Sequence, residues 1–239
     1  MTTWYYFHIS FPEVCTLART ISPYIGFDVF QRRGSGAATV VKLMMACNDM
    51  SLANQTLADW KKEQPPRRKT RAFGARIYFL RMEFAHLYEG LKVIDEIQRD
   101  PALLELVASC DLQTRRSFDD LITYQKGGAK HAVLKDLAGK VRHNIAFHYQ
   151  QAGTLIENAI DDFARRGKNS SETRADTAPD WHFEVADVVV DQVVCRGLWG
   201  ISPGAGSSAR IDEVAMKIHE LFLSFMDFSG EFIWRYCKL

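Results

Sequence analysis

The chain has 239 residues, 47% of them hydrophobic and 25% charged, and its net charge is +1. It is long enough to bury a substantial core, and its balanced charge gives no indication for or against a nucleic-acid partner. We expect no membrane span, since the sequence lacks a run of roughly 18 apolar residues, and no secretory signal in its opening stretch, MTTWYYFHISFPEV.

The first half of the sequence predicts two helices after an irregular start. Residues 1–35 are rich in aromatic side chains and interrupted by prolines and glycines, which indicates short irregular elements. Residues 37–63 predict a helix that the two prolines of QPPRRKTR stop. Residues 71–98 predict a long helix, because apolar residues recur every three or four positions on one face. This seam comprises Phe73, Ile77, Leu80, Phe84, Leu87, Leu91 and Ile94.

The second half predicts further helices and one polar loop. Short helices are expected at 101–109 and 113–126, and a second long amphipathic helix at 130–166. Residues 167–181 are polar and predict a loop, whereas the valine-rich residues 182–194 are compatible with a strand or a helix. SPGAGSS predicts a turn before a last helix over 210–239. The seam of that helix comprises Ile211, Ile218, Leu221, Phe225, Phe232 and Tyr236.

These elements predict an all-α fold. Two long helices with matched apolar seams, at 71–98 and 130–166, are typical of a helical bundle with two long antiparallel core helices and shorter helices around them. We expect a single domain over 1–239, with its core at about 37–166 and a C-terminal helix at 210–239.

One stretch inside the second long helix places several polar side chains in an apolar environment. It reads KVRHNIAFHY, residues 140–149. On a helix that turns about 100° per residue, His148 lies about 20° from Val141 and therefore in the seam. Asn144 precedes His148 by one turn, and Arg142 lies on the opposite shoulder of the seam. Buried polar groups are costly, so this arrangement indicates a functional site.

The residue types suit cleavage of a phosphodiester without a metal. A histidine of near-neutral pKa accepts or donates a proton, and a guanidinium holds a phosphate and stabilises its growing charge. RNA supplies its own nucleophile, the 2′-hydroxyl. The alternative for His148 is a core histidine whose ring nitrogens are satisfied by a carbonyl or by Asn144.

RHNIAFH resembles the R-x(4–6)-H motif of the HEPN superfamily, all-α proteins that include many prokaryotic RNA-cleaving toxins and antiviral effectors. The family often has a polar residue after the arginine, and His143 fits. The resemblance implies that Arg142 and His148 are the catalytic pair and that His143 and Asn144 support it. It also implies a homodimer, because HEPN nucleases usually build the cleft between two protomers.

A second match to the same spacing is RMEFAH, from Arg81 to His86. Met82 is not polar, and His86 lies about 120° from the seam at Leu80, outside the apolar face. We therefore place the site at 142–148.

Two other groups of residues have functional and structural interpretations. Arg67, Arg68, Lys69 and Arg71 form a basic run that could hold an RNA backbone or simply be a solvated loop. Glu83 and His86 form an E-x-x-H unit, which diiron bundles use twice, but only one copy occurs here. An exposed helical face is the simpler interpretation of that unit.

No other catalytic or redox pattern is present in the sequence. The glycine-rich stretches GSGAAT and GAGSS lack the flanking pattern of a phosphate or dinucleotide loop, and GxSxG and HExxH do not occur. The cysteines lie far apart without a CxxC pair, which favours free thiols in a reducing compartment. They are Cys15, Cys47, Cys110, Cys195 and Cys237.

The sequence therefore predicts a cytoplasmic, metal-independent endoribonuclease of HEPN type, with a toxin or phage-defence role that the resemblance implies. The expected partners are RNA, a second copy of the chain, and a cognate antitoxin or other partner protein, with no cofactor and no metal. The alternatives are a non-catalytic helical module that binds a nucleotide or a protein, and a metal-binding bundle around Glu83 and His86.

Overall fold

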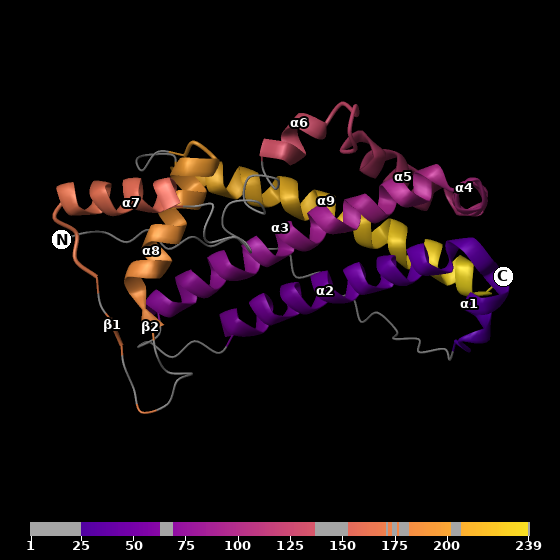
Figure 1. The fold of residues 1–239 in the computed structure, drawn as a ribbon, viewed down its shortest axis with the longest axis horizontal. Helices are drawn as coiled ribbons and strands as arrows, with labels where there is room; N and C mark the ends of the chain where they lie inside the picture. The colour runs from indigo at the N-terminus through magenta and orange to yellow at the C-terminus, as the bar shows by residue number, and fades with distance from the viewer. Residues whose placement is uncertain are drawn as a thin grey trace.

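The fold is all-α, as the sequence predicts (Figure 1). The computed structural model describes residues 25–62, 69–136, 153–170, 172–173, 176, 182–201 and 207–238. Its α-helices are α1 (Asp28–Arg33), α2 (Ala37–Lys62), α3 (Lys69–Arg99), α4 (Pro101–Ser109), α5 (Leu112–Thr123), α6 (His131–Leu134), α7 (Gly153–Arg165), α8 (Glu184–Gln192) and α9 (Ser207–Lys238). A 3₁₀ turn, η1 (Gly34–Gly36), joins α1 to α2, and a π-helical segment, η7 (Val193–Leu198), continues α8.

Three long helices form the body of the molecule. α2 and α3 pack along each other in opposite directions, and α9 runs beside them in the same direction as α3 (Figure 1). The short helices α1, α4 and α5 lie at the end where α9 finishes, whereas α7, α8 and η7 lie at the opposite end. None of the helices in the described part of the chain is long and apolar enough to cross a membrane.

The apolar seams of α3 and α9 form the core. In the described half of the predicted α3 seam, Phe84, Leu87, Leu91 and Ile94 are at most 2% exposed, which confirms the helical periodicity there. The α9 seam residues Ile218, Leu221, Phe225, Phe232 and Tyr236 are also buried. The core thus includes α9, which lies beyond the 37–166 frame.

Aspartates determine where α4 and α5 begin. The Asp100 carboxylate accepts hydrogen bonds from the backbone N–H groups of Ala102 and Leu103, at 2.9 and 3.3 Å, and Pro101 occupies the first turn. The Asp111 carboxylate accepts a 2.7 Å hydrogen bond from the Thr114 N–H. Both side chains satisfy N–H groups that have no partner within the helix, as an N-cap does.

The predicted helix at 130–166 is described only at its two ends, by α6 and α7. Its middle, residues 137–152, lies outside the described residues. The valine-rich segment is a helix, α8, after a two-residue strand. That strand, β2 (His182–Phe183), directly follows the predicted polar loop 167–181 and pairs antiparallel with β1 (Glu172–Thr173), which lies inside this loop.

Candidate functional site

The residues of the predicted catalytic site lie outside the described residues. Arg142, His143, Asn144 and His148 all fall within 137–152, between α6 and α7. Their assignment therefore stays a prediction from sequence.

The predicted basic run is only partly described. Arg67 and Arg68 fall within 63–68, outside the described residues, whereas Lys69 and Arg71 lie in the first turn of α3. RNA binding by this run also stays a prediction.

The second match to the motif, Arg81 to His86, lies on α3 and is described in full. Arg81 is buried, and its guanidinium carbon lies 5.9 Å from the ring centroid of Tyr78. His86 is partly exposed, and its Nδ1 lies 3.6 Å from an Asp49 carboxylate oxygen on α2. Five residues along a helix turn the side chains about 140° apart. Arg81 and His86 therefore face different neighbours, Tyr78 and Asp49.

In the part of the chain that the structure describes, the E-x-x-H unit on the same helix is not joined by other metal ligands. Glu83 is 8% exposed and His86 is directed to Asp49. Among the residues that the structure describes, no group of three or more histidine, cysteine, aspartate or glutamate side chains is arranged to hold a metal ion.

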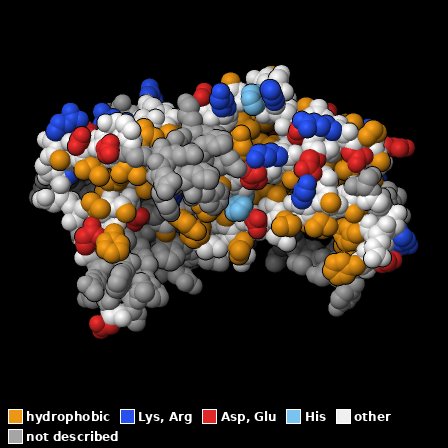
Figure 2. Space-filling model, viewed as in Figure 1, with side chains coloured by type: hydrophobic (Ala, Val, Ile, Leu, Met, Phe, Trp, Pro, Cys, Tyr) orange, Lys and Arg blue, Asp and Glu red, His pale blue; other side chains and the backbone are white. Residues whose placement is uncertain are grey.

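The described residues do form a charged groove at the end of the molecule where α7 packs on α8 and η7. The groove has a volume of about 700 Å³. Its apolar wall comes from Leu155, Ala159 and Val193, and its charged side chains include Arg165 and Arg196. Figure 2 shows hydrophobic side chains next to acidic and basic ones over α7. A groove that combines an apolar wall with a few polar groups is typical of a ligand site.

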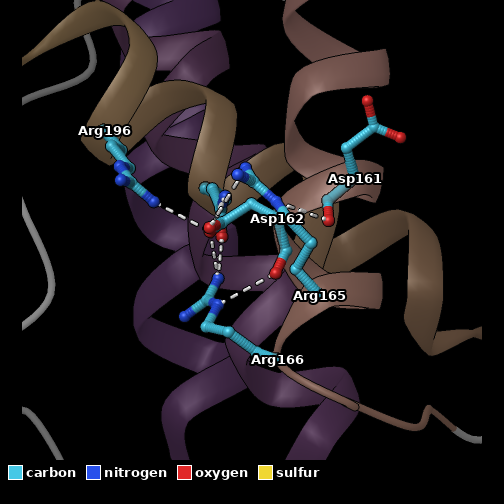
Figure 3. Close-up of polar contacts among 6 residues, drawn as sticks. Asp161, Asp162, Arg165, Arg166 and Arg196 are labelled. Carbon is cyan, nitrogen blue, oxygen red and sulfur yellow. Dashed lines mark hydrogen bonds and ion pairs between the residues drawn. The ribbon is translucent and has the colours of Figure 1, made fainter.

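Asp162 is the centre of this groove, and three arginines surround it (Figure 3). One carboxylate oxygen, Oδ2, accepts hydrogen bonds from Arg166 Nη2, from Gln192 Nε2 at 2.8 Å and from Arg196 Nη1 at 2.8 Å. The other oxygen lies 3.9 Å from Arg165 Nη2. Asp162 therefore links α7 to α8 through Gln192 and to η7 through Arg196.

The contacts of Asp162 stabilise its charged form. The hydrogen bond from Gln192 is the main cause that lowers the pKa of the Asp162 carboxyl, and Arg166, Arg196 and Arg165 lower that pKa further against the opposing effect of burial. Three guanidinium charges and the Asp162 charge leave two positive charges in the cluster, and Asp161, which also lines the groove, lowers the net charge of this region to +1. The carboxylate of the neighbouring Asp161 points away from this cluster (Figure 3). We call Asp162, Arg165, Arg166, Gln192 and Arg196 the arginine cluster.

Sequence reasoning did not single out the arginine cluster. Asp162, Arg165 and Arg166 have the i, i+3, i+4 spacing of ion pairs on one helical face, so this part of the signal is visible in the sequence. Gln192 and Arg196 follow about thirty residues later, and only the packing of α7 on α8 and η7 brings them to the same carboxylate.

Comparison with family models, curated proteins and solved structures gave no match to this chain.

Proposed function

We propose that this protein is a metal-independent endoribonuclease of HEPN type. The observation that carries the proposal is RHNIAFH, which places an arginine, a polar neighbour and a histidine at the spacing of the HEPN motif. The all-α architecture of the described chain is compatible with it. A toxin or phage-defence role, a homodimer and a cognate antitoxin belong to the same proposal and follow from the resemblance, and the cytoplasmic location that we propose with them rests on the widely separated cysteines.

In this mechanism RNA provides the nucleophile. His148 accepts the proton of the 2′-hydroxyl, the 2′-oxygen bonds to the adjacent phosphorus, and the bond from phosphorus to the 5′-oxygen breaks. The leaving 5′-oxygen takes up a proton, and the upstream fragment ends in a 2′,3′-cyclic phosphate. Arg142 holds the scissile phosphate and stabilises the negative charge of the transition state, with His143 and Asn144 as supporting residues.

Cleavage of a mixed cellular RNA pool in excess chelator tests this proposal. We expect the wild-type protein to cleave RNA and His148→Ala to lose at least about 100-fold in rate, because general acid–base catalysis contributes about 10²–10⁴-fold. His86→Ala is the matched control, since it removes the histidine of the second match, in which the residue after the arginine is the non-polar Met82, and should retain activity. Equal cleavage by all three proteins would contradict the assignment of His148, and no cleavage by the folded wild type would contradict the nuclease.

The second candidate is a non-catalytic module that binds a nucleotide, and the arginine cluster favours it. The described residues that line the groove supply guanidinium groups and an apolar wall but no histidine. Such a groove is suited to hold a phosphate-bearing ligand without cleaving it. Binding of RNA without cleavage in the assay above would favour this module over the nuclease.

A further inference from the structure

We propose that the groove between α7 and η7 binds a phosphate group of single-stranded RNA, with Arg165 and Arg196 as the donors. These residues are distinct from Arg142 and His148, so the inference stands whether or not the chain cleaves RNA. Four features of the groove carry it: donors left available, a residue that holds them in place, a surplus of positive charge, and an apolar wall.

Arg165 and Arg196 retain donors for a ligand. A guanidinium has five N–H donors. Arg196 uses Nη1 on Asp162, and its side chain is 47% exposed. Arg165 uses Nε on the Asp161 carbonyl, its contact with Asp162 is 3.9 Å long, and its side chain is 76% exposed. Both guanidiniums border the groove, so their other N–H groups can reach a phosphate there.

Arg166 and Gln192 have a different role, because their polar groups are engaged within the cluster. Arg166 Nε donates to the Asp162 carbonyl at 3.2 Å, and its Nη2 donates to the Asp162 carboxylate and, at 2.8 Å, to Gln192 Oε1. Together they fix the Asp162 carboxylate, which in turn fixes Arg196. A donor that is held in position before binding loses less conformational entropy when the ligand arrives.

The electrostatics of the cluster favour an anion. Three guanidiniums and the two carboxylates of Asp162 and Asp161, both of which line the groove, leave a net charge of +1, and a phosphodiester of RNA carries one negative charge. Arginine is the side chain best suited to phosphate, because its planar fork of donors pairs with two phosphate oxygens.

The size and the wall of the groove favour a nucleotide over a bare phosphate ion. The volume of about 700 Å³ lies in the range of about 300–1,000 Å³ that is typical of small-molecule sites. Leu155, Ala159 and Val193 offer apolar surface next to the arginines. A sugar and base can therefore rest on this wall while the phosphate contacts Arg165 and Arg196.

The test is binding of a fluorescently labelled single-stranded RNA in which every 2′-oxygen is methylated, so that cleavage through this oxygen cannot occur. The full chain is titrated into this probe as wild type, Arg165→Gln, Arg196→Gln and Arg99→Gln. Arg99 is the matched control: its side chain is also 76% exposed, and it pairs with Asp95 four residues before it on α3. Each of the three variants loses one positive charge from an arginine that is paired with an aspartate. The variants therefore differ only in where the charge is lost.

We expect each groove variant to bind about tenfold more weakly, since a hydrogen bond to a charged group contributes about that factor or more. We expect Arg99→Gln to bind within about twofold of wild type. The slope of log affinity against log salt should fall by about 0.7 in each groove variant, the value for one phosphate contact on a single strand. Equal losses in all three variants, or no loss in the groove variants, would overturn the inference.

A mononucleotide and inorganic phosphate, added as competitors, distinguish the source of the phosphate. Weak competition by both supports the RNA strand as the ligand, whereas displacement of the RNA by low concentrations of the mononucleotide would overturn RNA in favour of a free nucleotide.

Arg165→Gln keeps the test valid if Arg196→Gln misfolds, because its exposed side chain makes only a long contact with Asp162. The methylated probe reports binding alone and the cleavage assay reports the nuclease, so a failure of the nuclease proposal would be visible separately from a failure of this one.

Discussion

At the scale of the residue, Asp162 is the most heavily engaged side chain of the candidate site. Its carboxylate joins three arginines and one glutamine from α7, α8 and η7, and its side chain is only 17% exposed. Removal of its charge would leave three guanidiniums facing one another without a counter-ion. The cluster therefore depends on an ionised Asp162.

The pH dependence of stability tests this dependence. The pKa of Asp162 is lowered in the folded protein, chiefly by the hydrogen bond from Gln192, relative to an ordinary value of 3.8. A carboxyl whose pKa is lowered by folding stabilises the protein above its unfolded pKa, and this contribution is lost as pH falls through the folded pKa. The melting temperature of Asp162→Asn should therefore lie below that of wild type at neutral pH, and the difference should shrink as pH falls below 3.8.

Asp161→Asn serves as the control for this measurement, because the Asp161 carboxylate points away from the arginines (Figure 3). Its melting temperature should follow that of wild type over the same pH range. A difference between wild type and Asp162→Asn that stays constant to about pH 3 would contradict the role of the ionised carboxylate.

At the scale of the element, α3 and α9 approach each other closely at Gly90. A Cβ atom at this position would lie 2.8 Å from the Phe225 ring and 3.4 Å from the methyl group of Met50. Phe225 is 0% exposed, so its ring has no free space into which it can move. Gly90 is therefore a packing residue, and it lets a large aromatic side chain of α9 lie against the α3 backbone.

Gly90→Ala should lower the free energy of unfolding by about 1–2 kcal/mol, because overpacking of about 1–3 kcal/mol exceeds the gain of up to about 1 kcal/mol in helix propensity. Gly230→Ala on α9 is the matched control. Among the described residues, no atom outside its own stretch of helix lies within 4 Å of its added Cβ, so the propensity gain alone should stabilise the protein by up to about 1 kcal/mol. Urea denaturation of both variants measures these changes, and stabilisation by Gly90→Ala would show that the two helices do not pack as described.

The elements that could be predicted from sequence are those with a long, regular apolar period. The bounds of the helix at 71–98 and of the last helix were predicted within a few residues. In each helix the apolar residues, such as Phe84 and Leu91 of α3 and Phe225 of α9, recur at helical spacing and are buried. The segment at 182–194 could not be assigned, since a valine-rich run fits a buried strand or a helix equally well. Its contacts with α3 and α7 favour the helix α8, and such contacts are not readable from local sequence.

At the scale of the whole molecule, one continuous core joins the long helices to the shorter ones. α9 belongs to this core: Phe228 packs on Phe118 of α5 and on Phe232, with ring centroids 4.9 and 5.0 Å apart. The sequence predicted α9 as a helix but assigned it no place, because its partners lie about a hundred residues away in the chain. Long-range packing of this kind decides where an amphipathic helix docks.

The two candidate sites also differ in whether they can be recognised from the sequence alone. A short motif such as Arg142 to His148 is readable from sequence because its residues lie on one helical stretch. The arginine cluster needed the fold, because Asp162 and Arg196 are joined only by the packing of α7 on η7. If the protein acts on RNA as we propose, the first site provides the chemistry and the second holds the strand.

The proposed mechanism makes the substrate's own 2′-hydroxyl the nucleophile, and a single substitution in the RNA can remove this group from one junction. A defined RNA is first mapped to find a junction that the wild-type protein cleaves in excess chelator. The same RNA is then made with a single 2′-deoxynucleotide on the upstream side of this junction. With this mechanism, cleavage there stops while other junctions are still cleaved and yield 2′,3′-cyclic phosphate ends. Unchanged cleavage at the deoxy junction would contradict it.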